Sequence, residues 1–134
     1  MNYLLVCDLD DTLTGDKKAI EQFNQIITLK KFNLGYSSGR FKSSMISLIE
    51  SSGLINPDFI IANLGTEIYY SPDWKIDNEW KKIIKNCWNK EKILTTLESF
   101  NLKSQPYEKE YVLPFYTDDE TLVKKIKKKI ERKN

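Results

Sequence analysis

The fold is most clearly indicated by Tyr3-Leu4-Leu5-Val6-Cys7-Asp8-Leu9-Asp10-Asp11-Thr12. The first five of these residues are apolar and rich in β-forming types, which predicts a buried strand. Three aspartates, at positions 8, 10 and 11, follow within four positions. Like charges this close raise one another's pKa unless a cation offsets them, and carboxylate oxygens suit a hard divalent cation. Two interpretations remain open at this point: an ordinary acidic turn, or a strand that leads into a magnesium site.

The next segments predict a parallel α/β sheet. Apolar residues recur at helical spacing from Lys17 to Leu29, and residues 32–37 have the composition of a second strand. A strand, a helix and a strand in this order form a βαβ unit with a right-handed crossover. A second helix around Met45–Ile49 is expected to stop at Gly53, before a third buried strand at 59–62 and a hairpin strand up to Tyr70.

Polar residues follow the second predicted strand, in Ser37-Ser38-Gly39-Arg40. Ligands of open α/β sheets bind beyond the carboxyl ends of the strands, so this loop is expected beside Asp8. The Ser38 hydroxyl, the Gly39 amide and the N-terminus of the next helix together suit a phosphate. The alternative is a plain capping turn. Arg40 could contact the substrate, or it could hold the loop or an acidic neighbour.

Asp8-Leu9-Asp10-Asp11-Thr12 resembles the DxDxT signature of the haloacid dehalogenase (HAD) superfamily of phosphatases and phosphotransferases. The resemblance implies that Asp8 is a nucleophile that forms an aspartyl-phosphate, and that Asp10 is the general acid and base. It also implies Mg²⁺ at Asp8 and Asp10. Phosphate contacts are implied from Ser38, from Gly39 and from the backbone of Leu9 and Asp10. The chemistry agrees, because a carboxylate can act as a covalent nucleophile, and a second one two residues along an extended backbone returns to the same side.

Within that superfamily the chain is most similar to sucrose-phosphate phosphatases. The likeness rests on four features: the DxDxT stretch with Gly15-Asp16 after it, Tyr36–Arg40, Pro57-Asp58 leading to Gly65–Tyr69, and Asp77, Trp80 and Trp88. It implies an α/β fold, with an incomplete Rossmann-like HAD core and a partial α+β cap. The implied substrate is sucrose 6-phosphate, with further contacts from Thr12, Arg40 and Glu67. A hinge or hydrogen-bonding role for Glu67 is an equal alternative.

The domain boundary is expected near residue 70. Residues 1–70 are predicted to form the core, with three strands and a hairpin. Residues 71–134 are predicted to form the partial cap, with two helices, the first carrying a stripe from Ile76 to Cys87. A polar linker at 103–110, a strand at Tyr111–Tyr116 and a lysine-rich helix from Asp119 to Arg132 complete it.

Two motifs that the resemblance implies have no match in the sequence: a lysine and a Gly-Asp…Asn-Asp cluster. Lys103 and Asp118-Asp119 are set aside, because the first precedes no suitable strand and the second falls in the cap. The chain is therefore expected to be the N-terminal part of such an enzyme, with impaired activity. Its first strand is expected to leave an apolar edge open to self-association or to completion by another chain.

Composition excludes several classes of protein. The 21 basic and 19 acidic residues give a net charge of +2, which argues against a dedicated nucleic-acid binder. No apolar run or signal peptide indicates a membrane or secreted protein, so a cytoplasmic location is expected. The absence of histidine excludes Ser-His-Asp and Cys-His catalysis and the usual zinc sites. Two other functions stay open: a non-catalytic phosphosugar-binding or regulatory module, and a phosphomutase relative.

Overall fold

The computed structural model describes residues 3–30, 32–106 and 109–131. The chain divides into two compact units, Met1–Ile83 and Ile84–Asn134. Helix α3 (Asn78–Cys87) contains the boundary between them. The candidate site residues predicted from the sequence all belong to the first unit.

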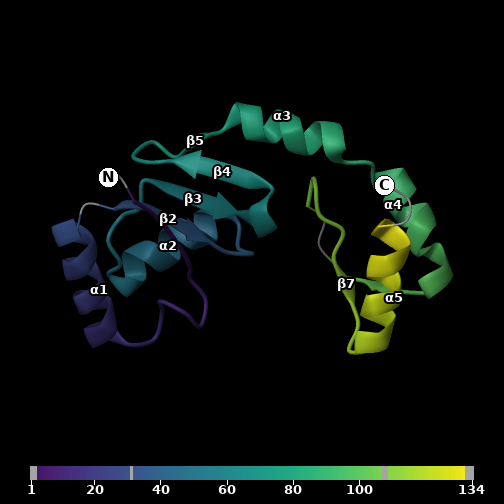
Figure 1. Cartoon of the computed structure of the whole chain (residues 1–134), viewed down its shortest axis with the longest axis horizontal. Helices are drawn as coiled ribbons and strands as arrows, with labels where there is room; N and C mark the ends of the chain where they lie inside the picture. Colours follow the sequence, from purple (N-terminus) through teal and green to yellow (C-terminus); the bar gives the residue numbers. More distant parts are fainter. Residues whose placement is uncertain (1–2, 31, 107–108, 132–134) are drawn as a thin grey trace. The chain divides into compact units, whose positions relative to one another are not determined.

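The first unit is built on one five-stranded sheet (Figure 1). In spatial order its strands are β1 (Leu4–Asp8), β2 (Asn33–Ser37), β3 (Phe59–Ala62), β4 (Glu67–Tyr70) and β5 (Lys75–Ile76). The first three strands are parallel, and β4 and β5 continue the sheet antiparallel. Asp8 pairs with Ser37, and Ser37 pairs with Ile61, so the carboxyl ends of the three parallel strands lie together. The predicted α/β class and the hairpin are confirmed.

Two helices connect the parallel strands, and both match the prediction. Helix α1 (Lys17–Lys30) begins after Asp16, whose carboxylate accepts hydrogen bonds from the backbone N–H groups of Lys18 and Ala19. Helix α2 (Lys42–Ser52) ends at Gly53, which has the left-handed conformation with φ of 78°. Asp16 therefore caps the start of α1, and Gly53 ends α2 as predicted.

The core lies between the helices and one face of the sheet. Alternate residues of β2 and β3 point into it, together with the apolar stripes of both helices, which places α1 and α2 on the same face. Its buried members are Leu9, Ile20, Ile27, Leu34, Tyr36, Met45, Ile49, Leu54, Ile60 and Ala62. Each large apolar side chain buried in this way contributes about 1.5–3 kcal/mol to the free energy of folding. The buried Tyr36 satisfies its hydroxyl by donating to the Ile55 carbonyl oxygen at 3.0 Å.

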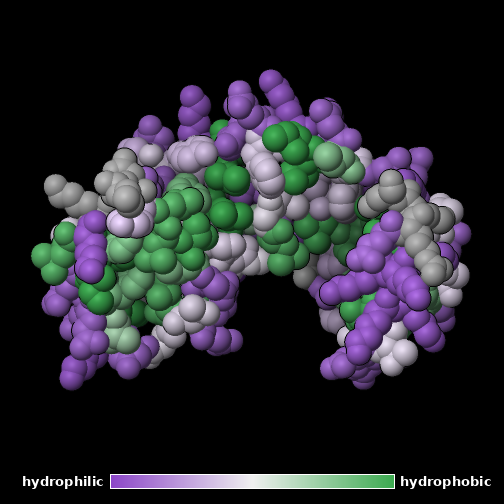
Figure 2. Space-filling model, in the orientation of Figure 1, coloured by the Kyte–Doolittle hydropathy of each residue, from purple (hydrophilic) through white to green (hydrophobic). Residues whose placement is uncertain are grey.

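Strand β1 is an edge of the sheet. Within the described part of the chain it pairs only with β2. Leu4 and Val6, on the face away from the helices, are 64% and 43% exposed. Figure 2 shows hydrophobic residues gathered over the strands of this unit. The apolar edge predicted from the sequence is thus present in the described structure.

The first unit extends beyond residue 70, where the sequence placed the end of the core. Residues Lys75–Ile76 form β5, which pairs with β4. Ile76 therefore belongs to a strand, and its predicted place on a helical stripe is wrong. Helix α3 begins after Asp77, whose carboxylate accepts from the N–H groups of Glu79 and Trp80. A cap that starts at residue 71 stays a prediction.

After the end of α3, the described residues of the second unit form two helices, two short strands and a 3-10 turn. They are α4 (Lys90–Leu97), η2 (Glu98–Phe100), β6 (Lys103–Ser104), β7 (Phe115–Tyr116) and α5 (Glu120–Glu131). Of the strand predicted over 111–116, only Phe115–Tyr116 forms a strand, which begins directly after Pro114. Val112 makes an isolated antiparallel bridge with Lys109. The partner of β7 is β6, which lies in the segment predicted as linker. The predicted end of the last helix, Arg132, lies outside the described residues. Among the described helices, none is long and apolar enough to span a membrane.

Candidate functional site

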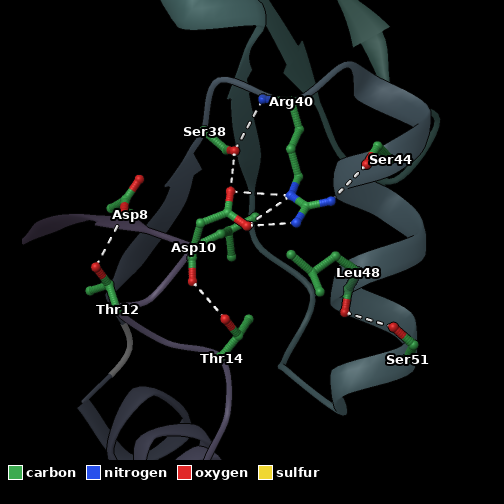
Figure 3. Close-up of polar contacts among 10 residues, drawn as sticks. Asp8, Asp10, Thr12, Thr14, Ser38, Arg40, Ser44, Leu48 and Ser51 are labelled. Carbon is green, nitrogen blue, oxygen red and sulfur yellow. Dashed lines mark hydrogen bonds and ion pairs between the residues drawn. The ribbon is translucent and has the colours of Figure 1, made fainter. Parts of the chain in front are cut away.

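Asp8 is the last residue of β1, and its side chain is exposed. The chain then turns, with Leu9 fully buried beneath it. The Leu9 carbonyl oxygen accepts from the Leu13 N–H and from the Thr14 hydroxyl, both at 3.2 Å. Thr12 donates its hydroxyl to Asp8 Oδ2 at 3.1 Å (Figure 3). The buried leucine thus holds a tight turn that presents the Asp8 carboxylate at the carboxyl edge of the sheet.

Asp10 faces the loop after β2. Arg40 donates from Nη2 to Asp10 Oδ1 at 2.7 Å, and from Nε to Oδ1 at 2.9 Å and Oδ2 at 3.1 Å (Figure 3). The Ser38 hydroxyl donates to Asp10 Oδ2 at 2.8 Å. Hydrogen bonds from Arg40 and then from Ser38 lower the pKa of the Asp10 carboxyl, so Asp10 is held as a carboxylate. The sequence left two roles open for Arg40, and its described contacts agree with the one in which it holds an acidic neighbour.

The loop that carries Ser38 and Arg40 is anchored by the end of β3. The Ser38 N–H donates to the Ile61 carbonyl oxygen at 3.0 Å, and the Asn63 N–H donates to that of Arg40 at 2.8 Å. Leu64 N–H reaches the Ser38 carbonyl oxygen at 3.4 Å. Ser38 itself is only 5% exposed. The loop is therefore a fixed part of the sheet edge.

Asn63 is a site-supporting residue that the sequence analysis missed. It begins the 3-10 turn η1 (Asn63–Gly65), is 2% exposed and has a φ of 53°. Asparagine tolerates this left-handed conformation better than most residues. Its buried Oδ1 has no hydrogen-bond partner among the described residues. An asparagine directly after a buried strand was the available signal.

The structure separates the predicted site residues into two groups. Asp8, Asp10, Thr12, Ser38 and Arg40 share the carboxyl edge of β1 and β2, with exposed Gly39 in the same loop. The Leu9 N–H, expected to bind phosphate, donates to the Ser37 carbonyl oxygen at 3.3 Å. Glu67 lies on β4 and accepts from the Tyr69 hydroxyl at 2.9 Å, outside the Asp10 network.

The two aspartates predicted to be catalytic do not share the geometry expected of an extended backbone. Strand β1 ends at Asp8, and the turn that follows includes Asp11 with a φ of 56°. The alternation that would return Asp10 to the side of Asp8 therefore stops. Asp8 is hydrogen-bonded to Thr12, while Asp10 is hydrogen-bonded to Ser38 and Arg40 (Figure 3).

The carboxylate oxygens of Asp8 and Asp10 are chemically suited to a magnesium ion, and Asp8 would be its first ligand. Its exposed carboxylate has hard oxygens of the kind that Mg²⁺ prefers. The Asp10 carboxylate would join only after leaving Arg40, since both of its oxygens accept hydrogen bonds. Among the described residues no group of three or more His, Cys, Asp or Glu side chains gathers to hold a metal ion.

The sequence profile of the family sucrose-6F-phosphate phosphohydrolase matches residues 1–134. The chain belongs to this family. It is 26% identical to the probable sucrose-phosphatase 3b of Arabidopsis thaliana over 97% of this chain and 34% of that protein. A glucosylglycerol-phosphate synthase of Pseudomonas anguilliseptica is also 26% identical, over 76% of this chain and 14% of the synthase.

The solved sucrose-phosphatase of Synechocystis sp. PCC6803, in complex with sucrose and phosphate, has a similar fold. The TM-score is 0.83 and the identity 25%, over 99% of this chain and 57% of that one. This phosphohydrolase-family chain thus spans about a third of the first curated relative. The predicted resemblance to sucrose-phosphate phosphatases within the HAD superfamily is confirmed.

Proposed function

We propose that this chain carries the nucleophile and the phosphate loop of a Mg²⁺-dependent phosphatase that acts on sucrose 6-phosphate. The observation that supports it most is the exposed Asp8 carboxylate at the end of β1, paired in register with the strand that leads into Ser38 and Arg40. A nucleophile and an anion-binding loop therefore share one sheet edge. Membership of a sucrose-phosphatase family supports a phosphorylated sugar as the substrate.

The proposed reaction has two steps. An Asp8 carboxylate oxygen attacks phosphorus and the bond from phosphorus to the sugar oxygen breaks. Asp10, which takes up a proton once it leaves the Arg40 and Ser38 hydrogen bonds that hold it as a carboxylate, gives that proton to the sugar oxygen. Water then attacks the phosphorus of the aspartyl-phosphate while Asp10 takes a proton from it. Inorganic phosphate leaves and the Asp8 carboxylate is restored. Ser38 and Gly39 bind the phosphoryl oxygens throughout.

Charge is the main obstacle to the first step, because a phosphate dianion must approach a carboxylate. A Mg²⁺ ion held by Asp8 would offset this repulsion between the two anions. Arg40 is the cation that contacts Asp10, and its charge is already paired with that carboxylate. We therefore expect the 134 residues alone to turn over sucrose 6-phosphate very slowly.

The test joins this chain to the part of the Synechocystis sucrose-phosphatase that has no counterpart in it. Phosphate release from sucrose 6-phosphate with Mg²⁺ should rise by about 10²–10³ or more over the 134-residue chain, the usual size of an electrostatic contact or two. Asp8→Asn should abolish the gain, because an amide cannot form the acyl-phosphate. Asp11→Asn, which removes the same charge next to the site, should retain it. Turnover that survives Asp8→Asn would contradict the proposed nucleophile.

A binding module is the second candidate. The relative of Pseudomonas anguilliseptica is a synthase with a similar segment covering 14% of its length, so such segments also occur outside sucrose-phosphatases. On this alternative, sucrose 6-phosphate would bind the 38–40 loop, and the fusion described above would bind it without releasing phosphate. Calorimetry on that fusion distinguishes the two candidates.

A further inference from the structure

The Asp10 carboxylate occupies the hydrogen-bonding groups that a phosphate would need. Ser38 gives its hydroxyl to Asp10 Oδ2 at 2.8 Å, and the same hydroxyl oxygen accepts from the Arg40 N–H at 3.1 Å. The Arg40 guanidinium gives Nε and Nη2 to Asp10 and Nη1 to the Ser44 hydroxyl at 3.0 Å. A carboxylate of the chain itself is thus bound where the loop could bind an external anion (Figure 3).

The number of protons decides how these groups can be shared. A serine hydroxyl has one proton to donate, so Ser38 cannot donate to Asp10 and to a phosphate oxygen at the same time. The Nε edge of the Arg40 guanidinium already binds the Asp10 carboxylate in a forked arrangement, so it too cannot bind a phosphate in the same way at the same time. The Ser38 hydroxyl therefore has to exchange one anion for the other.

We propose that phosphate and Asp10 compete for Ser38 and Arg40, so that binding of the phosphate releases Asp10. This inference rests on the proposed function, and it adds an order of events to it. Before the phosphate binds, hydrogen bonds from Ser38 and Arg40 hold Asp10 against the loop after β2. Once Ser38 and Arg40 turn to the phosphate, the Asp10 side chain is released close to the bond that breaks.

Arg40 is a positioning residue in this scheme, because it acts through Asp10. Ser44, on the first turn of α2, fixes the other end of the guanidinium. The helix therefore determines where Arg40 returns once the phosphate has left, and the exchange is reversible.

The experiment measures binding of inorganic phosphate to the full 134-residue chain by NMR, at constant ionic strength and without metal. Asp10→Asn removes the charge that competes for the loop, and Asp11→Asn removes an equal charge next to it from an exposed residue. Both should weaken general repulsion of phosphate, but only Asp10→Asn should also release Ser38 and Arg40. We expect Asp10→Asn to increase phosphate affinity about tenfold more than Asp11→Asn, the size of one charge-assisted hydrogen bond.

A second measurement uses the unmutated chain. Phosphate should shift the side-chain carboxyl carbon of Asp10 together with the amides of Ser38 and Gly39, along one binding curve. Equal gains in phosphate affinity in the two variants, with no shift of the Asp10 carboxyl signal, would overturn the proposed competition but not phosphate binding by the loop. If phosphate shifts the amide signals of Ser38 and Gly39 in none of the three proteins, the loop does not bind phosphate, and the proposed function is overturned as well.

Discussion

The ring of Phe59 lies over the backbone of Gly35 on the neighbouring strand. The two residues pair in register between β2 and β3, and a Cβ atom at position 35 would lie 2.3 Å from the nearest ring carbon. Phe59 also pairs with Tyr70 of β4, with ring centroids 6.2 Å apart. The absence of a side chain at Gly35 thus lets an aromatic pair cover the sheet on the face away from the helices.

Gly35→Ala should therefore destabilise the protein by about 1–3 kcal/mol, the usual effect of overpacking a well-filled site. The methyl group would push the Phe59 ring away from the strand and from Tyr70. Urea unfolding measures the change in free energy. The matched background is Phe59→Leu, in which the smaller side chain should tolerate the methyl group and reduce the penalty. An equal penalty in both backgrounds would show that the ring is not the cause.

Alkaline stability should depend on Tyr69. Burial, followed by the hydrogen bond to Glu67, raises the pKa of Tyr69 to about 12 in the folded chain. An unfolded tyrosine ionises near pH 10, so above that pH the folded state binds more protons than the unfolded state. The contribution is complete below about pH 10 and is lost progressively as the pH rises toward the folded value.

Tyr69→Phe should remove this part of the pH dependence. The unfolding free energies of the unmutated chain and of Tyr69→Phe are measured from neutral to alkaline pH. Above about pH 10 the unmutated chain should lose more stability than Tyr69→Phe. Glu67→Gln should make the total loss smaller and end it at a lower pH, because removing the acceptor charge lowers the pKa of Tyr69 in the folded chain but not in the unfolded one. A difference between the unmutated chain and Tyr69→Phe that stays constant with pH would contradict the assignment.

The exposed edge of β1 should cause self-association. Leu4 and Val6 carry no charge and the strand contains no proline, so apart from Asp8 at its end it lacks the features that usually block edge pairing. Sedimentation velocity of the 134-residue chain should show an apparent mass that rises with concentration. Val6→Lys should suppress this rise. The control, Ile83→Lys, adds the same charge at another apolar side chain that is 52% exposed, and it should not.

The sequence was informative wherever a periodic pattern or a capping residue governs local structure. Helices α1 and α2 show a helical period and strands β1 and β3 are continuous apolar runs, and Asp16 and Gly53 mark helix ends in their own right. Strands β5 and β6 have two residues each, which is too short for any period to be visible. Ile76 was misplaced for this reason: its spacing fits a helix, but its pairing with Tyr69 places it in the sheet.

The site was predictable in its members and less so in its contacts. Asp8, Asp10, Ser38 and Arg40 follow from two motifs at the ends of strands. The choice of Asp10 over Asp8 as the partner of Arg40 depends on where β1 ends and the turn begins, which no local pattern specifies. Asn63 was missed because its role lies in a backbone hydrogen bond to Arg40, a contact across 23 positions of the chain.

The last prediction separates the two aspartates by the leaving group. If Asp10 protonates the departing oxygen, its removal should matter most when that oxygen is a strongly basic sugar alkoxide. General acid catalysis contributes about 10²–10⁴-fold, so Asp10→Ala in the fused enzyme should lose that much turnover of sucrose 6-phosphate. With p-nitrophenyl phosphate, whose leaving group needs no proton, the loss in the first step should be far smaller. A burst of p-nitrophenolate should then precede slow turnover, because water still lacks its base. Asp8→Asn should abolish both reactions alike. Equal losses with both substrates, and no burst, would show that Asp10 is not the acid.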